Sequence, residues 1–218
     1  MNTIGLFPLG LVLFPGSLLP LHIFEPRYRS LMNSVIDKDT SFGINLVESS
    51  KLFEVGCAAK VVRVSQRYPD GRFDVITQGQ KRYHLHNLSE SSASYFVGSV
   101  EYFEDILEEM NTEVFLECKK KYSQIIDAVY PEKIDQLTNP QSLSMEFPSF
   151  FMAQKSGLSL LQKQELLEMR SENARLQFLV NHLDSILPEI TRQENFNRII
   201  KGDGYLPPAP PKPDAKSQ

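Results

Sequence analysis

Residues 8–29 read PLGLVLFPGSLLPLHIFEPRYR, and the rest of the predicted fold is arranged around this stretch. An apolar strand is interrupted at Pro15-Gly16 and resumes after Pro20, where Leu21 and Ile23 alternate with their neighbours at a period of two. Proline is favoured at the first position of a helix. The stretch therefore predicts a strand that turns into a helix at Pro26.

The helix expected after Pro26 is amphipathic. Tyr28, Leu31, Met32 and Val35 stand at positions i, i+3, i+4 and i+7, which makes one apolar stripe. We expect this stripe to cap or plug a barrel formed by the strands around it.

Short runs rich in Val, Ile, Phe and Tyr predict further strands. Pro69-Asp70-Gly71 has the composition of a hairpin turn, and Gly79 predicts a turn or bulge. Strands at this spacing indicate a compact antiparallel barrel or sandwich. The expected strands cover residues 42–47, 58–64, 73–77, 83–88 and 96–102.

Beyond residue 103 the apolar period becomes helical. A first stripe ends near Pro131, Pro148 begins a second helix that Gly157 can end, and Ser159 and Ser171 can cap two more. We expect Pro188 to kink or break the fourth helix before a last helical piece to about residue 201. The predicted units are a barrel over 1–103, a helical bundle over 104–202 and a proline-rich disordered tail over 203–218.

Composition indicates a soluble protein of the reducing cytoplasm. Two cysteines among 218 residues predict no disulfide framework, and prolines break the apolar N-terminus, so neither a signal peptide nor a membrane span is expected. The net charge is −4. Residues 1–103 carry 10 Lys+Arg against 9 Asp+Glu, and residues 104–202 carry 11 against 16. This balance argues against nucleic-acid binding.

Four segments together resemble the N-terminal substrate-binding domain of Lon proteases. They are LFPG at 13–16 with LPLHIFEPRYR at 19–29, FGI at 42–44 with VGCAAKV at 55–61, DGRFD at 70–74 with GQKRY at 79–83, and LS at 158–159 with KQELLE at 163–168. The resemblance covers about residues 4–200. It implies an α+β fold with a PUA-like antiparallel β-barrel, one inserted helix and a helical bundle, in a domain that recognises exposed polypeptide segments.

The sequence lacks the motifs of the protease's other parts. It contains no G-x-x-x-x-G-K-[ST] nucleotide loop, and we expect no peptidase domain that could supply the protease's Ser-Lys dyad. The G-x-S-x-G motif of other nucleophilic hydrolases is absent as well. We therefore expect a stand-alone, non-catalytic member of the family, without cofactor or metal.

Apolar residues in turns are the candidates for polypeptide binding. Leu18 and Leu19 lie between two prolines, and Phe53 lies in an expected loop over residues 49–56. If exposed together at one barrel end, they would form an apolar patch. The alternative is that they close the barrel as core residues.

The other residues of the first motif are expected to be structural. Glu25 can stabilise the start of the helix, and Arg27 or Arg29 can pair with Glu25 or with a carboxylate of the barrel to fix the corner between strand and helix. This structural role is favoured over a charged binding site. His22 is expected to pack or form a hydrogen bond, and His182 to join the bundle core. His84 and His86 face one side of a strand without an obvious third metal ligand. The motif residues assigned to structure are Phe14, Pro15, Pro20, His22, Glu25, Arg27 and Tyr28.

The function expected from these features is non-catalytic binding of non-native or client polypeptides. Delivery of clients to a protease or chaperone would be one such role. The alternative is RNA binding, because PUA-like barrels often bind RNA, but a pI of about 5.6 argues against it.

Overall fold

In the computed structural model, residues 2–90, 95–129 and 147–190 are described. Six strands form one sheet within these ranges, in the order β1-β6-β5-β4-β3, with β2 paired to β5. Their bounds are β1 Asn2–Gly5, β2 Leu18–Ile23, β3 Phe42–Glu48, β4 Lys51–Arg67, β5 Phe73–Glu90 and β6 Phe96–Phe103.

The N-terminal chain closes the sheet into a barrel. After β1 pairs with β6, Leu6 and Leu9 form parallel bridges with Gly43 and Leu46 of β3, the strand at the opposite end of the sheet. The N–H of Phe7 donates to the Gly43 carbonyl at 2.8 Å. The expected antiparallel sheet and the α+β class are confirmed. Only the bridges between the N-terminal chain and β3, which close the barrel, are parallel.

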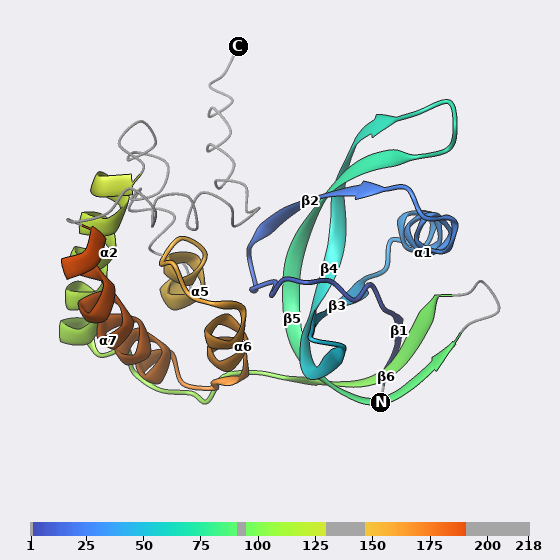
Figure 1. Ribbon diagram of the computed structural model, residues 1–218. Helices are drawn as coiled ribbons and strands as arrows, with labels where there is room; N and C mark the ends of the chain where they lie inside the picture. The colour runs from blue at the N-terminus through green and yellow to red at the C-terminus, as the bar shows by residue number, and fades with distance from the viewer. Residues whose placement is uncertain (1, 91–94, 130–146, 191–218) are drawn as a thin grey trace, which may run out of the picture.

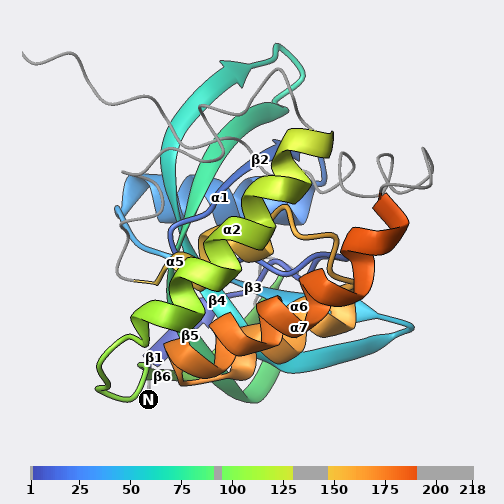
Figure 2. The same cartoon turned by 90° about the vertical axis from the view of Figure 1, so that its left-hand side faces the viewer.

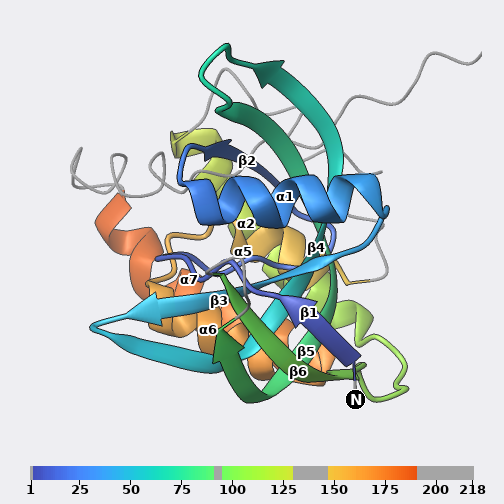
Figure 3. The same ribbon diagram turned by 90° about the vertical axis from the view of Figure 1, so that its right-hand side faces the viewer.

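Helix α1 (Pro26–Asp37) begins and packs as expected. Proline occupies its first turn, and its buried residues are Tyr28, Leu31, Met32 and Val35, the four of the predicted stripe. Tyr28 packs on Phe7 with ring centroids 4.1 Å apart. Figure 3 shows α1 lying across the barrel, on the side turned away from the other helices.

Four helices are described beyond β6: α2 Thr112–Val129, α5 Pro148–Ala153, α6 Leu160–Glu168 and α7 Glu172–Ile190. Helices α2 and α7 pack side by side, and α5 and α6 lie between them and the barrel (Figures 1 and 2). Ser159 caps α6 in a capping box with Gln162, and Ser171 accepts from the Ala174 N–H at the start of α7. Both predicted caps are confirmed.

Helix α7 continues through Pro188 to Ile190, so the expected break does not occur before that residue. A proline in the last turn removes few hydrogen bonds, because the helix ends soon after it. The expected last helical piece to residue 201 and the proline-rich tail lie outside the described residues.

One hydrophobic core runs through barrel and helices. Phe14 of the barrel stacks on Phe150 of α5 with ring centroids 5.4 Å apart, and both rings are buried. The same cluster of buried residues extends from Phe42 in β3 to Leu179 in α7. The two halves are therefore packed against each other, rather than only linked by the chain.

Strand β5 is longer than expected. The N-terminal chain can pass over β5 at Gly79 because this residue has no side chain. A Cβ atom at Gly79 would lie 2.2 Å from the carbonyl oxygen of Phe14. The turn after Phe14 is held there by hydrogen bonds from the Gly79 N–H to Ser17 and from the Gly16 N–H to Gly79. The register of β5 against β4 shifts between Gly79 and Arg82, as expected for a bulge.

We expect Gly79→Ala to destabilise the fold by about 2 kcal/mol, because the added methyl group must displace the Phe14 backbone. Gly10→Ala is the matched control, since a Cβ there meets no atom within 4 Å, and its effect should stay within about 0.5 kcal/mol. Urea unfolding followed by circular dichroism measures both. Equal free energies of unfolding would contradict the close approach at Gly79.

Candidate functional site

A cleft of about 320 Å³ lies where the barrel meets the helices. The Pro15-Gly16 turn forms one wall, Gln80 and Lys81 of β5 another, and Phe147 and Phe150 the helical side. Phe103, Glu104, Arg82 and Asp105 complete the lining. The surface of the cleft is mainly apolar.

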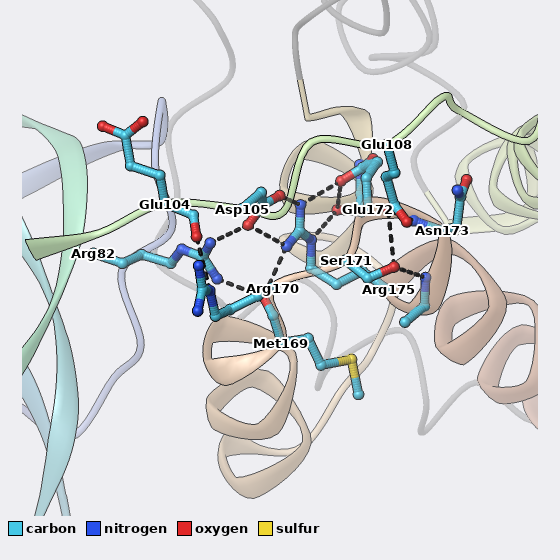
Figure 4. A network of polar contacts seen from close by, with 12 residues as sticks. Arg82, Glu104, Asp105, Glu108, Met169, Arg170, Ser171, Glu172, Asn173 and Arg175 are labelled. Carbon is cyan, nitrogen blue, oxygen red and sulfur yellow. Dashed lines mark hydrogen bonds and ion pairs between the residues drawn. The ribbon is translucent and has the colours of Figure 1, made fainter.

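Two buried arginines share one carboxylate beside this cleft. Arg82 of β5 and Arg175 of α7 both form ion pairs with Asp105, which stands in the connection between β6 and α2 (Figure 4). Arg175 is fully buried and Arg82 is 4% exposed. Both guanidinium groups also donate to the Met169 carbonyl, at 2.5 Å from Arg82 and 2.8 Å from Arg175.

The network is extended by Glu172, which lies one turn before Arg175. Its carboxylate accepts from Arg175 at 2.6 Å and from the Ser149 hydroxyl at 2.7 Å. Burial raises the pKa of Glu172 despite the attraction of Arg175, and burial lowers the pKa of Arg82 despite the attraction of Asp105. Two cations face two carboxylates, so the buried charges balance. The arrangement is suited to holding segments together, since its charged groups are committed to one another.

The thiols are also poor candidates for chemistry. Cys57 and Cys118 are buried, and burial raises the pKa of each to about 12. Because the thiolate is the nucleophilic form, burial disfavours nucleophilic attack by either side chain at neutral pH.

A second surface lies on the outside of β2. Leu18, Pro20, His22 and then Phe24 alternate with the core-facing residues Leu19 and Ile23, so the first four share the outer face. Phe24 is 57% exposed. On β4, the strand across β5 from β2, Val62 is exposed as well. We call the outer side of β2 with Phe24 the β2 face.

The backbone of β2 is free along one edge within the described part of the chain, since β5 is its partner strand there. Gly79 donates to Ser17, so Leu19, Leu21 and Ile23 exchange hydrogen bonds with β5 by the alternation of an antiparallel ladder. Leu18 and His22 therefore direct their backbone groups away from β5. Pro20 between them has no N–H, which weakens this edge for strand pairing.

His22 is fixed on this face by a hydrogen-bonded cluster. Its Nδ1 lies 2.5 Å from Asp74 Oδ1, and the Tyr68 hydroxyl donates to the other carboxylate oxygen at 2.8 Å. The His22 ring stacks on Phe24 with centroids 6.0 Å apart. The bond from His22 is the main cause that lowers the pKa of Asp74. His22 thus makes both of the contacts considered for it from the sequence, a hydrogen bond with Asp74 and packing against the Phe24 ring.

The three residues predicted to form an apolar patch do not lie together. Leu19 is 3% exposed and is therefore no part of an exposed patch. The alternative of a core position holds for it, because the pleat of β2 turns its side chain into the core. Leu18 is half-buried on the opposite side. Phe53 belongs to β4 rather than to a loop, and it packs partly against the core.

Register separates Phe53 from Leu18. Leu18 pairs with Gln78, which in turn faces Lys60, seven residues along β4 from Phe53. At about 3.3 Å per residue, the strand places them roughly 20 Å apart. Phe53 and Leu18 are therefore not neighbours at one barrel end.

The motif residues occupy positions that fix the corner between strand and helix. Arg27 pairs with Glu25 at 2.9 Å and lies over the Tyr28 ring. Phe14 is buried, Pro15 lines the cleft and Pro20 is exposed on β2.

The other histidines have local partners. His86 pairs with Glu101 at 3.0 Å, His84 packs on Phe103, and His182, half-buried, lies 2.9 Å from the Ser156 carbonyl oxygen. Burial lowers the pKa of His182. Within residues 2–90, 95–129 and 147–190, no three His, Cys, Asp or Glu side chains are grouped to hold a metal ion. In the same ranges, no helix is both long and apolar enough to cross a bilayer.

Sequence reasoning missed the buried network. Arg82 lies within GQKRY, one of the segments that carried the resemblance, but its partners are distant in sequence. The available signal was an arginine inside an apolar stripe: Arg175 stands between Glu172 and Leu176, both of which are buried in α7. A buried arginine needs a carboxylate partner, although the stripe does not identify which one.

Comparison with known proteins places this geometry in a family. The family model for the ATP-dependent protease La (LON) substrate-binding domain matches residues 3–185. A Lon protease of Parabacteroides distasonis is 34% identical over 113 residues, covering 48% of this chain and 14% of that protein. A Lon protease of Cytophaga hutchinsonii is 25% identical over 207 residues, covering 89% of this chain and 25% of that protein. The chain thus spans about a quarter or less of these relatives.

Solved structures agree in fold. A Lon N-terminal domain protein from Xanthomonas campestris superimposes with a TM-score of 0.67 at 23% identity, covering 83% of this chain and 98% of that one. The N-terminal domain of a Mycobacterium avium complex Lon protease gives a TM-score of 0.61 at 15% identity, covering 84% and 98%.

We expect Asp105→Asn to lower the free energy of unfolding by about 3 kcal/mol, because it leaves two buried arginines sharing less negative charge. Its neighbour supplies a matched control: Glu104 forms an exposed pair with Lys81, and Glu104→Gln should cost less than about 1 kcal/mol. Chemical denaturation of both variants is the measurement. A similar small loss in the two would show that the buried network contributes little.

Both thiols should resist a disulfide reagent such as 5,5′-dithiobis(2-nitrobenzoate) in the folded protein at about pH 8, since burial disfavours their thiolates. In denaturant, both should react within minutes. Rapid modification of the folded protein, read by absorbance, would contradict the burial of Cys57 or Cys118.

Proposed function

Because this chain belongs to the family of Lon substrate-binding domains, we propose that it is a non-catalytic module that binds non-native polypeptides. The observation that carries the proposal is the β2 face, where a large exposed aromatic ring stands beside a strand edge that has no partner strand among the described residues. Exposed apolar surface on a folded protein commonly marks a binding site.

The binding mode combines backbone and side-chain contacts. An extended client segment would accept from and donate to Leu18 and His22 along the free edge of β2. An apolar client side chain would pack on Phe24, which the stacked His22 ring supports from one side. Pro20 limits the number of backbone hydrogen bonds, so pairing would be short and reversible. Weak, sequence-tolerant contacts of this kind suit an adaptor that passes clients to a protease or chaperone.

The cleft between barrel and helices is the second place where a client could bind. Its lining offers Phe103, Phe147 and Pro15 as apolar contacts. Gln80 is exposed and lines the cleft, so a variant at this position tests the cleft separately. Gln80→Trp would fill the cleft, and Gln66→Trp on the exposed part of β4 is its control.

We expect Phe24→Ser to weaken binding of a denatured model protein about fivefold or more, because it removes the largest exposed apolar contact of the β2 face. Leu161→Ser on α6 is the matched control: Leu161 is 54% exposed, close to the 57% of Phe24, and lies away from β2. The measurement is fluorescence anisotropy with labelled, reduced and carboxymethylated lactalbumin.

Salt dependence separates this function from RNA binding. Apolar contacts should hold between about 50 and 300 mM salt, whereas phosphate contacts weaken steeply over such a range. If Phe24→Ser binds as wild type and Gln80→Trp does not, the cleft replaces the β2 face as the client site. If neither variant differs from its control, the proposal of polypeptide binding at these two surfaces is wrong.

A further inference from the structure

The connection Glu104–Asn111 between β6 and α2 presents large apolar side chains to water. Leu107 is fully exposed, and Ile106 and Met110 are exposed by 50% and 44%. We call residues 104–111 the acidic loop. A soluble protein rarely exposes three such side chains within five residues unless they contact something.

This loop is not loose. Ile106 donates its N–H to the Arg170 carbonyl at 2.9 Å, and Arg170 donates back to the Glu104 carbonyl at 2.9 Å. The Glu108 carboxylate accepts from the Ser171 hydroxyl and from the Asn173 N–H at 2.8 and 3.0 Å, as Figure 4 shows. The bond from the Asn173 N–H is the main cause that lowers the pKa of Glu108.

The end of the loop is fixed by a single asparagine. Asn173 Nδ2 donates to the Glu109 carbonyl at 2.9 Å, and its Oδ1 accepts from the Asn111 N–H at 2.7 Å. Asn111 in turn caps α2 through the N–H groups of Glu113 and Val114. The backbone that carries Leu107 is thus ordered before any partner arrives, which lowers the entropy that binding must cost.

Charge determines which partner fits. Residues 104–117 contain six carboxylates and no Lys or Arg. Four of the six have partners in the structure: those of Glu104, Asp105, Glu108 and Glu117. Glu109 and Glu113 are exposed, and no cation of the described residues pairs with either carboxylate. A second copy of the same surface would bring like charges together, so an isologous dimer is disfavoured.

We propose that the acidic loop and the first turn of α2 dock a basic amphipathic segment of a partner protein. Leu107, Ile106 and Met110 supply the apolar contact, and Glu109 and Glu113 pair with Lys or Arg at its border. The site lies outside the β2 face, so it gives the chain a docking point for a partner that is independent of client binding.

The test uses a fluorescein-labelled helical peptide of about 14 residues, with Leu along one face and Lys on the other. A counterpart with Glu in place of Lys is the charge control. Fluorescence anisotropy should show that Leu107→Ser raises the dissociation constant about tenfold, as for a central apolar contact. The double variant Glu109→Gln, Glu113→Gln should raise it about threefold and flatten its salt dependence. Because these side chains are exposed, all variants should fold, and circular dichroism checks this.

Two controls distinguish the acidic loop from the client site. Phe24→Ser and Leu161→Ser should leave the affinity for the Lys peptide unchanged, even if Phe24→Ser weakens client binding. The proposal is overturned if the Glu peptide binds as well as the Lys peptide or if Leu107→Ser binds the Lys peptide as wild type does. It is also overturned if Phe24→Ser weakens binding of the Lys peptide as Leu107→Ser does. If the β2 face proves not to bind clients, the result for the Lys peptide at the acidic loop still stands.

Discussion

The ion pairs that Arg82 and Arg175 make with Asp105 are the constraint on which the arrangement of the two halves depends. One arginine comes from the barrel, the other from the last described helix, and the carboxylate from the chain that connects them. A buried guanidinium left without a carboxylate would be costly, so the halves cannot separate or rotate without exposing or orphaning charge. The stacked rings of Phe14 and Phe150 add apolar contact across the same boundary.

This joint also organises the surfaces around it. Asp105 and Arg170 hold the beginning of the acidic loop, whereas Ser171 and Asn173 hold its later part. Glu104 and Asp105 of this loop also line the cleft, together with Pro15-Gly16 and Phe147. The buried charges therefore anchor one residue of the acidic loop, Asp105, and Arg82 and Asp105 also contribute to the lining of the cleft.

The distribution of apolar residues fits a protein whose work is binding. Phe24 on the β2 face and Leu107 on the acidic loop are both exposed, although they belong to different halves of the molecule. Among the described residues, one stands beside a strand edge without a partner strand and the other beside two carboxylates without a cation partner. These settings favour different partners, an extended segment in the first case and a basic amphipathic one in the second.

The sequence by itself determined the elements that depend on local order. Pro26 and the apolar stripe from Tyr28 fixed α1, and Ser159 and Ser171 fixed two helix starts, because caps and periodicity act within a few residues. Tertiary structure alone decided which side chains are exposed in strands. Leu18 and Leu19 look alike in sequence, yet the register with β5 directs one outward and the other into the core. The tertiary structure also decided the surroundings of Arg82. Asp105 and Arg175 are 23 and 93 residues away from it in the sequence, and only the packed fold brings these charges together.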